Sequence, residues 1–327
     1  MIRAVGLLLA VLLSVAACAP RYAPPGPADR DPALVLETDS VFVTSDGLRL
    51  PLRVWLPAEK PRAIVLALHG LGDYGNAFSG QALGFTAAGV GLVAYDQRGF
   101  GASPSPGLWP GQDRLVEDLR EAAEEVHRRF PGVPLYLLGE SMGGAVVLAA
   151  QGSDRPADVA GIILAAPAVW ARSTQPWYQR AALWMAVRLF PGWKPTGEGL
   201  NRMPSDNMDM LRKLAADPLV QKAFRIDLLE GVVNLMDSAL AAGPHIDGPV
   251  LLLYGQHDQI VPRQPIERLW ASLSDDPQAR FVDYPDGWHM LLRDLQGATV
   301  LADILAWIKE PQGPLPSGFE RGRAAGS

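Results

Sequence analysis

The sequence predicts an α/β fold, in which a mostly parallel central sheet is flanked by helices. Short apolar runs without polar alternation recur along the chain, as is typical of strands covered on both faces. These runs are Ala63–Leu68, Val90–Tyr95, 134–138, Gly161–Ala165, 249–254 and Ala279–Tyr284. Longer helical patterns alternate with them, and this alternation favours parallel strands joined by crossover helices.

Local signals define the elements around this repeat. Two strand-like segments, Val41–Val43 and 50–55, stand on either side of the turn dipeptide Asp46-Gly47 and predict a β-hairpin at the start of the domain. Helices are predicted over 113–130, 143–151 and Gly297–Lys309.

One stretch interrupts the alternation. Residues 168–242 contain helical patterns at 176–190, 205–216 and 228–242 but no clear strand. We expect a helical cap over the carboxyl edge of the sheet, and the alternative is that these are additional core helices. The apolar first helix carries Trp177 and Trp184, which we predict to line an apolar substrate cavity.

The N-terminus predicts export. Arg3 precedes a 14-residue apolar run, 4–17, which is shorter than the roughly 20 residues of a membrane-spanning helix. A basic residue followed by a short apolar run indicates a secretory signal. The run ends in VAAC, which resembles the lipobox of bacterial lipoproteins and implies that Cys18 becomes a lipid-bearing N-terminus. An ordinary signal peptide and an uncleaved anchor are the alternatives.

These signals divide the chain into segments. We assign a signal peptide to 1–17, a Pro-rich tether to 18–36, an α/β domain to 37–310 with its cap at about 168–242, and a disordered tail to 311–327. The Pro-rich composition of the tether predicts an extended spacer that lifts the domain off the membrane.

Composition excludes several classes of protein. The 327 residues include 29 basic and 35 acidic side chains, a net charge of −6, so we expect no nucleic-acid partner. With 48% hydrophobic residues, most of the chain can fold around a core. A single cysteine rules out a disulfide framework and a cysteine-based zinc cluster. We expect neither a metal nor an organic cofactor, and oligomeric state cannot be derived from the sequence.

A nucleophilic serine is indicated where the run 134–138 gives way to a helix. The letters GESMG, centred on Ser141, follow the G-x-S-x-G pattern of a nucleophile elbow in strand–turn–helix context. Such a sharp turn brings backbone so close that only glycine fits on both sides of it. A serine nucleophile requires a base that is oriented by a third group.

We predict His289 as that base and Asp258 as the orienting acid. Both follow apolar runs, which places them at the same sheet edge as Ser141, and the order Ser, Asp, His is that expected for this elbow. Weaker candidates, at the wrong end of a strand or too near the favoured residues, are His245, His257, Asp247, Asp283 and Asp286.

The tetrahedral intermediate needs preset hydrogen-bond donors for its negative oxygen. We predict the backbone N–H of Met142, after the nucleophile, and that of Leu71, in the loop after an earlier strand. His69 is interpreted as a residue that shapes this loop, and Asp96 and Arg98 as residues that stabilise a turn.

These residues together resemble the α/β-hydrolase superfamily from about residue 41 to 309, and within it the monoglyceride lipase and lysophospholipase-like branch, also called the serine aminopeptidase-like hydrolases. The motifs that carry the resemblance are HGLGDYGNAF, YDQRGFGAS, GESMGG, YGQHDQIVP and GWHMLLRD, with SDN at 205–207 and ADPLV at 216–220 in the insertion. The resemblance implies an α/β-hydrolase fold, a serine hydrolase acting on carboxylic esters, and a cap that forms a hydrophobic tunnel for an acyl chain.

We therefore expect an esterase or lipase that cleaves single-chain lipid esters through an acyl-enzyme and that is held on the periplasmic side of a bacterial envelope membrane by its lipid anchor. Ala19 after the cysteine favours the outer membrane. The alternatives are a thioesterase, a small-substrate peptidase or a xenobiotic esterase of the same fold and, more distantly, a lipid-binding lipoprotein without activity.

Overall fold

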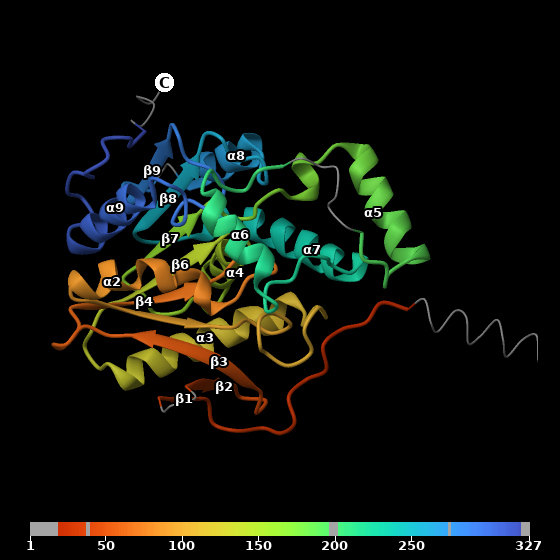
Figure 1. Ribbon diagram of the computed structural model, residues 1–327, viewed down its shortest axis with the longest axis horizontal. Helices are drawn as coiled ribbons and strands as arrows, with labels where there is room; N and C mark the ends of the chain where they lie inside the picture. Colours follow the sequence, from red (N-terminus) through yellow and green to blue (C-terminus); the bar gives the residue numbers. More distant parts are fainter. Residues whose placement is uncertain (1–18, 37–39, 196–201, 274–275, 322–327) are drawn as a thin grey trace, which may run out of the picture.

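A mostly parallel sheet forms the centre of the protein (Figure 1). The computed structural model describes residues 19–36, 40–195, 202–273 and 276–321. Within these ranges the sheet has nine strands in the order β1-β2-β3-β5-β4-β6-β7-β8-β9. They are β1 (Ala33–Val35), β2 (Val41–Val43), β3 (Arg49–Trp55), β4 (Ala63–Leu68), β5 (Val90–Tyr95), β6 (Leu135–Glu140), β7 (Gly161–Ala165), β8 (Val250–Gly255) and β9 (Ala279–Tyr284). Strands β1 to β3 pair antiparallel, as does β3 with β5, and all the other pairs are parallel.

Helices cover both faces of this sheet, which confirms the predicted α/β class. They are α2 (Ser79–Ala87), α3 (Gln112–Arg129), α4 (Met142–Gln151), α5 (Trp177–Leu189), α6 (Met208–Ala216), α7 (Ile226–Ala242), α8 (Arg263–Leu273) and α9 (Gly297–Lys309). Side chains alternate between two buried clusters. Along β4, Ile64, Leu66 and Leu68 face the cluster of α3, α4, α7 and α8, whereas the residues between them face α2 and α9.

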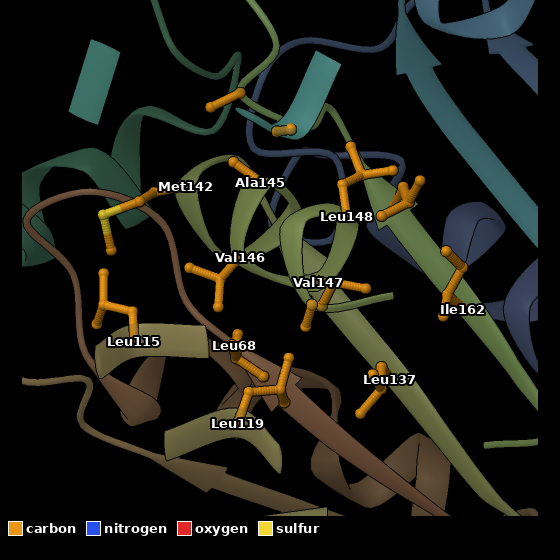
Figure 2. Packing of buried hydrophobic residues seen from close by; sticks show 14 of the residues in the cluster. Leu68, Leu115, Leu119, Leu137, Met142, Ala145, Val146, Val147, Leu148 and Ile162 are labelled. Atoms are coloured by element: carbon orange, nitrogen blue, oxygen red, sulfur yellow. The ribbon is translucent and has the colours of Figure 1, made fainter. Parts of the chain in front are cut away.

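Helix α4 fixes the centre of the first cluster. Its sequence MGGAVVLAAQ is almost wholly apolar, and nearly every residue is buried. Figure 2 shows Met142 and Val146 of this helix packed with Leu115 of α3 and Leu68 of β4. Because burying each large apolar side chain stabilises the fold by about 1.5–3 kcal/mol, the N-terminus of α4, where Ser141 lies, is firmly held.

The stretch between β7 and β8 contains no strand among its described residues, as expected, and carries α5, α6 and α7. The prediction of a cap needs one correction. Helix α7 buries Leu228, Leu235 and Ala239 in the same cluster as α4, so this part of the stretch is a core helix. The separate cap consists of α5, of which Val187 alone is buried, and α6, which buries no residue fully.

The predicted tether 18–36 is not an extended spacer over its described residues, because Ala33–Val35 form β1 of the sheet and residues before them lie against the domain. The backbone N–H of Arg21 donates to the carboxylate of Asp227 at 3.0 Å, and that of Gly26 donates to Asp46 at 2.7 Å. The prolines of this segment have no N–H to donate, but the residues between them do, and carboxylates of the domain accept those hydrogen bonds.

The prediction of a disordered tail is wrong for residues 311–321. Phe319 accepts a backbone hydrogen bond from Asp283 of β9 at 3.1 Å, and Glu320 forms a bidentate ion pair with Arg280. The segment therefore lies along the last strand. Residues 322–327 of the predicted tail lie outside the described residues.

No helix within the described ranges has both the length and the apolar character needed to cross a bilayer. The predicted signal peptide and Cys18 lie outside those ranges.

Candidate active site

Ser141 lies at a strained turn between β6 and α4. Its backbone has φ 51° and ψ −113°, a conformation that a residue other than glycine adopts only when its surroundings impose it. Its N–H donates to the carbonyl of Ala165 at 3.0 Å, and its own carbonyl accepts from the N–H of Ala168 at 2.9 Å. The turn is therefore fixed from the neighbouring strand β7.

The flanking glycines are sterically required, as predicted. A Cβ at Gly143 would lie 2.1 Å from the carbonyl oxygen of Leu68, and a Cβ at Gly139 would lie 2.5 Å from the backbone of Gly144. Any side chain at these two positions would displace backbone, so the elbow could not form.

Asp258 and His289 are brought together, from the loops after β8 and β9. Nδ1 of His289 donates to Oδ2 of Asp258 at 2.8 Å. The other oxygen of this carboxylate accepts from the N–H groups of Ile260 at 2.7 Å and Val261 at 2.9 Å. The proton on Nδ1 leaves Nε2 as the basic nitrogen of the neutral ring.

The charges around His289 keep its imidazole able to accept a proton, as a catalytic base must. Burial alone would lower its pKa. The charge and hydrogen bond of Asp258, together with the charge of Glu140, outweigh burial and the opposing charge of Arg293, so the pKa lies above the ordinary histidine value.

Ser141 shares the sheet edge with this pair, because β6, β7, β8 and β9 are parallel neighbours and all three side chains follow carboxyl ends of strands. Within the described residues, no hydrogen bond joins the Ser141 hydroxyl to His289. Catalytic hydrogen bonds are often long without substrate and shorten in the complex.

The other candidates take no part in the Asp258–His289 pair. His245 is exposed before β8, at the opposite end of the strand from Asp258. His257 is exposed, with its ring 5.3 Å from that of Trp288. Asp283 forms an ion pair with Arg263 at 2.6 Å.

His69 shapes the loop after β4, as predicted. Its buried ring donates from Nδ1 to the carbonyl of Gly70 at 2.9 Å and accepts at Nε2 from the N–H of Gln97 at 3.0 Å. Because Nε2 accepts a hydrogen bond, the ring is in its neutral form with the proton on Nδ1. Burial lowers its pKa despite the nearby carboxylates.

The same loop adjoins the elbow. A Cβ at Gly70 would lie 3.4 Å from Cβ of Ser141. Neither the N–H of Leu71 nor that of Met142 donates a hydrogen bond within the described part of the chain. Two backbone donors without a protein acceptor beside a strained serine suit an oxyanion.

The turn after β5 is held as expected. Oδ1 of Asp96 accepts from the N–H of Gly75 at 2.9 Å and from Arg53 at 2.7 Å. Arg98 is buried and pairs with Asp118 at 2.6 Å. These charges stabilise loops and do not reach Ser141 in any described contact.

Sequence reasoning missed a buried ionic network beside the site. Arg293, four residues after His289, pairs with Asp73 at 2.6 Å and with Glu140 at 2.5 Å. One cation thereby joins the loop that carries Leu71, the elbow and the histidine loop. Oε2 of Glu140 has no hydrogen-bond partner in the described structure. A lone arginine in a loop gives no sequence signal of burial.

The segment before α6 also holds the histidine loop. The N–H of Met290 donates to the carbonyl of Pro204 at 3.0 Å, and the hydroxyl of Ser205 donates to Asp294 at 2.5 Å. Asp294 in turn accepts from the N–H of Trp288 at 2.7 Å. Burial raises the pKa of Asp294 to about 6 despite these donors.

Trp177 and Trp184 are not brought to the catalytic candidates. Both lie on α5 with 76% and 57% of their surface exposed, and they line a hollow of about 420 Å³ on the cap together with Arg172, Arg180 and Glu230. The lining of this hollow includes none of Ser141, Asp258 and His289, so substrate binding by Trp177 and Trp184 stays a prediction. The described residues also contain no cluster of three or more potential metal ligands.

Solved structures share this fold. Monoacylglycerol lipase from Paleococcus ferrophilus superposes with a TM-score of 0.67 at 24% identity, covering 80% of this chain and 99% of that one. A soluble variant of the Saccharomyces cerevisiae monoglyceride lipase in complex with a substrate analogue has a TM-score of 0.69 at 21% identity, covering 89% of this chain and 100% of that one.

Curated relatives match over most of the domain. Monoacylglycerol lipase of Mycolicibacterium smegmatis is 26% identical over 283 residues, 82% of this chain and 95% of the relative. Human monoglyceride lipase is 26% identical over 277 residues, 82% of this chain and 89% of the relative.

Fold and site together define an α/β-hydrolase of the carboxylic ester hydrolase class. The sequence profile of the serine aminopeptidase S33 family matches residues 59–296. The chain belongs to this family.

Proposed function

We propose that the protein cleaves carboxylic esters of single-chain lipids, as monoacylglycerol lipases and lysophospholipases do. The observation that carries the proposal is the hydrogen-bonded pair of Asp258 and His289 at the same sheet edge as Ser141, whose strained backbone matches a nucleophile elbow. The similarity to proteins named monoacylglycerol lipase supports the choice of substrate class.

In the proposed reaction, Oγ of Ser141 attacks the acyl carbonyl while Nε2 of His289 takes its proton. The N–H groups of Leu71 and Met142 donate to the negative oxygen of the tetrahedral intermediate. His289 then protonates the leaving alcohol, and an acyl-enzyme remains on Ser141. A water molecule activated by His289 releases the fatty acid. Asp258 stabilises the imidazolium without taking its proton.

The cellular location is part of the proposal. We propose that the protein is a lipoprotein on the periplasmic side of a bacterial envelope, anchored through Cys18. The signal-like residues before Cys18 support this, and Ala19 favours the outer membrane. Two or more acyl chains would hold the protein stably on a bilayer.

A fluorophosphonate probe tests the chemistry. We expect the wild-type chain to be labelled and Ser141→Ala to remain unlabelled. Absence of labelling in the wild type, or equal labelling of the variant, would contradict the proposal. The alternative of a lipid-binding protein without activity would then be favoured.

A substrate panel tests the class. It contains monoacylglycerols and lysophospholipids of graded chain length beside thioesters, short xenobiotic esters and aminoacyl amides. We expect the highest kcat/KM on the single-chain lipid esters. A preference for thioesters, xenobiotic esters or amides would leave Ser141 as the proposed nucleophile but would contradict the proposed substrate class.

A further inference from the structure

Arg293 is a buried cation that takes no part in the proposed reaction steps. Only 9% of its surface is exposed. Its two terminal nitrogens bind different partners, since Nη1 donates to Asp73 at 2.6 Å and Nη2 donates to Glu140 at 2.5 Å. Burial opposes the charge, but the two carboxylates outweigh burial and raise the pKa of the guanidinium. Arg293 is therefore charged, and its fork joins two carboxylates.

Each carboxylate belongs to a segment that carries a group of the proposed reaction. Glu140 ends β6 and directly precedes Ser141. Asp73 lies in the loop after β4, two residues after Leu71, and its N–H donates to the carbonyl of Gly70 at 3.2 Å. This turn contains the backbone donor of Leu71, so a shift of Asp73 would also move that donor.

The backbone of Arg293 is fixed to the histidine loop. Its N–H donates at 2.7 Å to the carbonyl of Met290, the residue that follows His289. Its carbonyl accepts at 2.9 Å from the side-chain amide of Asn207, in the segment before α6. The backbone of Arg293 is thus tied to His289, while its side chain holds the two other segments.

The ionic network is a poor source of stability. Nε of Arg293 and Oε2 of Glu140 have no hydrogen-bond partner among the described residues. The network joins one cation to two carboxylates, Asp73 and Glu140. Because desolvation offsets the attraction within a buried ion pair, apolar side chains of similar volume often hold a fold equally well. What the ions add here is a defined geometry between three segments.

We propose that Arg293 is a positioning residue for the catalytic groups. Its guanidinium keeps the backbone donor of Leu71, the hydroxyl of Ser141 and the imidazole of His289 in register. Arginine suits this role because its planar fork presents separate N–H groups to two carboxylates, whereas the ammonium of lysine is a single point charge. This proposal rests on the proposed function, since it concerns the same reaction.

A hollow beside the network makes a chemical test feasible. Arg293 and Asp73 line a hollow of about 370 Å³, together with Gln81 of α2 and Lys213 of α6. A guanidinium ion fits into a space of this size. It can therefore occupy the place of a truncated Arg293 side chain.

Turnover of a short soluble ester by the full chain tests the proposal. We expect Arg293→Ala to lower kcat by about 10²-fold at the plateau of its pH profile, because a misplacement of about 1 Å costs this much. KM should stay within about twofold, since the contact supports the transition state and does not hold the substrate. Guanidinium chloride, at concentrations that leave circular dichroism unchanged, should restore part of the lost kcat. Sodium chloride is the salt control.

Arg293→Lys separates charge from geometry. It keeps the positive charge but cannot reach Asp73 and Glu140 from two nitrogens of one planar fork, so kcat should stay at least about tenfold below the wild-type value. The cation lowers the pKa of His289, against Asp258 and Glu140, which raise it. Arg293→Ala should therefore move the midpoint of kcat/KM to higher pH, and Arg293→Lys should leave it in place.

Arg280→Ala is the matched control. Arg280 is similarly buried and pairs with Glu320, but it lies near the start of β9, whereas His289 follows the end of that strand. We expect this variant to lose stability, to keep its kcat and to show no response to guanidinium.

A charge-neutral variant removes the network without leaving an unpaired buried charge. It combines Asp73→Asn, Glu140→Gln and Arg293→Met. We expect a folded chain with a kcat about 10²-fold below that of the wild type. This variant keeps the proposal testable if Arg293→Ala does not fold.

Four results would overturn the proposal. The first is a wild-type kcat in folded Arg293→Ala or in the charge-neutral variant. The second is a wild-type kcat in Arg293→Lys, which would assign the effect to charge alone. The third is a raised KM with kcat retained, which would place Arg293 against the substrate. The fourth is an equal loss of kcat, or an equal gain with guanidinium, in Arg280→Ala.

Fluorophosphonate labelling distinguishes this proposal from the proposed function. If the wild-type chain is not labelled at Ser141, the proposed function fails and the positioning role fails with it. If the wild-type chain is labelled and the Arg293 variants match it in kcat, the positioning role alone fails.

Discussion

Asp258 determines the state of His289 at the scale of single residues. Its carboxylate is fully buried and is held by two backbone N–H groups as well as by the imidazole. The ring therefore has one favoured tautomer and one favoured orientation. The role of this carboxylate is positional and electrostatic, and both contributions can be measured.

Replacing Asp258 with Asn should keep the fold and lower kcat by about 10⁴, as comparable triads lose on this change. The amide can donate to Nδ1, which stabilises the wrong tautomer. Turnover of a short soluble ester, with circular dichroism as the check on folding, measures the effect. Asp154→Asn, at an exposed position, is the matched control. An unchanged kcat for Asp258→Asn would mean that another carboxylate orients His289.

The pH dependence of activity should report the charges around His289. The imidazole must be neutral to accept a proton, so kcat/KM should rise with pH through a midpoint above the ordinary value of 6.5. Glu140→Gln removes a negative charge that raises this pKa, and the midpoint should move to lower pH. Glu124→Gln, exposed on α3, should leave the midpoint in place. A midpoint shifted to higher pH by Glu140→Gln would contradict the assigned electrostatics.

At the scale of elements, the junction of β6 and α4 depends on close backbone approach. The strand and the helix are both buried, so neither can move away to admit a side chain. Gly143 lies against Leu68 of β4, and the strained conformation of Ser141 is imposed from both sides.

Gly143→Ala should therefore abolish activity and destabilise the protein strongly, because its Cβ would overlap the carbonyl oxygen of Leu68. Gly80→Ala in α2 is the control, since a Cβ there meets nothing within 4 Å. That change should preserve activity and raise stability by up to about 1 kcal/mol. Urea denaturation with an activity assay compares the two. Equal behaviour of both variants would be inconsistent with the steric argument.

At the scale of the whole molecule, segments at both ends of the described chain are part of the folded structure. In residues 311–321, the ring of Phe319 makes a T-shaped contact with Tyr284, with ring centroids 6.2 Å apart, and Glu320 pairs with the buried Arg280. These contacts lie on β9, the last strand, whose following loop carries His289.

Deleting residues 311–327 should lower the melting temperature by about 4 °C or more, because Arg280 loses its charged partner and β9 its backbone contacts. Deleting 322–327 alone should have little effect. Differential scanning calorimetry of the two truncated chains makes the comparison. Equal melting temperatures would show that the segment contributes no stability.

The success of sequence reasoning varied with the kind of signal. Runs such as Ala63–Leu68 and Ala279–Tyr284 predicted strands with the right bounds, because full burial requires uninterrupted apolar residues. The pair of Asp258 and His289 followed from strand ends on one sheet edge. Periodicity also predicted α5 correctly. It could not predict that Trp177 and Trp184 are exposed, because an apolar helix face in the sequence does not show which element packs against it. Helix α8, with Pro265 in its first turn, was missed.

The charged network and the tail show a second limit. Arg293 reads in sequence as a solvated loop residue, and only the fold brings Asp73 and Glu140 to it. The Pro- and Gly-rich composition of 311–321 suggested disorder, whereas Arg280 and Tyr284 on β9 supply the contacts that order it.

The segment along β9 has a further consequence for how copies of the chain meet. β9 is the terminal strand of the sheet, and an open terminal strand offers a row of N–H and C=O groups that another chain can extend. Here Phe319 and Arg321 use those groups, with hydrogen bonds to Asp283 and Phe281. The molecule thus covers the β9 edge of its sheet against edge-to-edge growth, a safeguard against aggregation that comes from eleven residues of unremarkable composition.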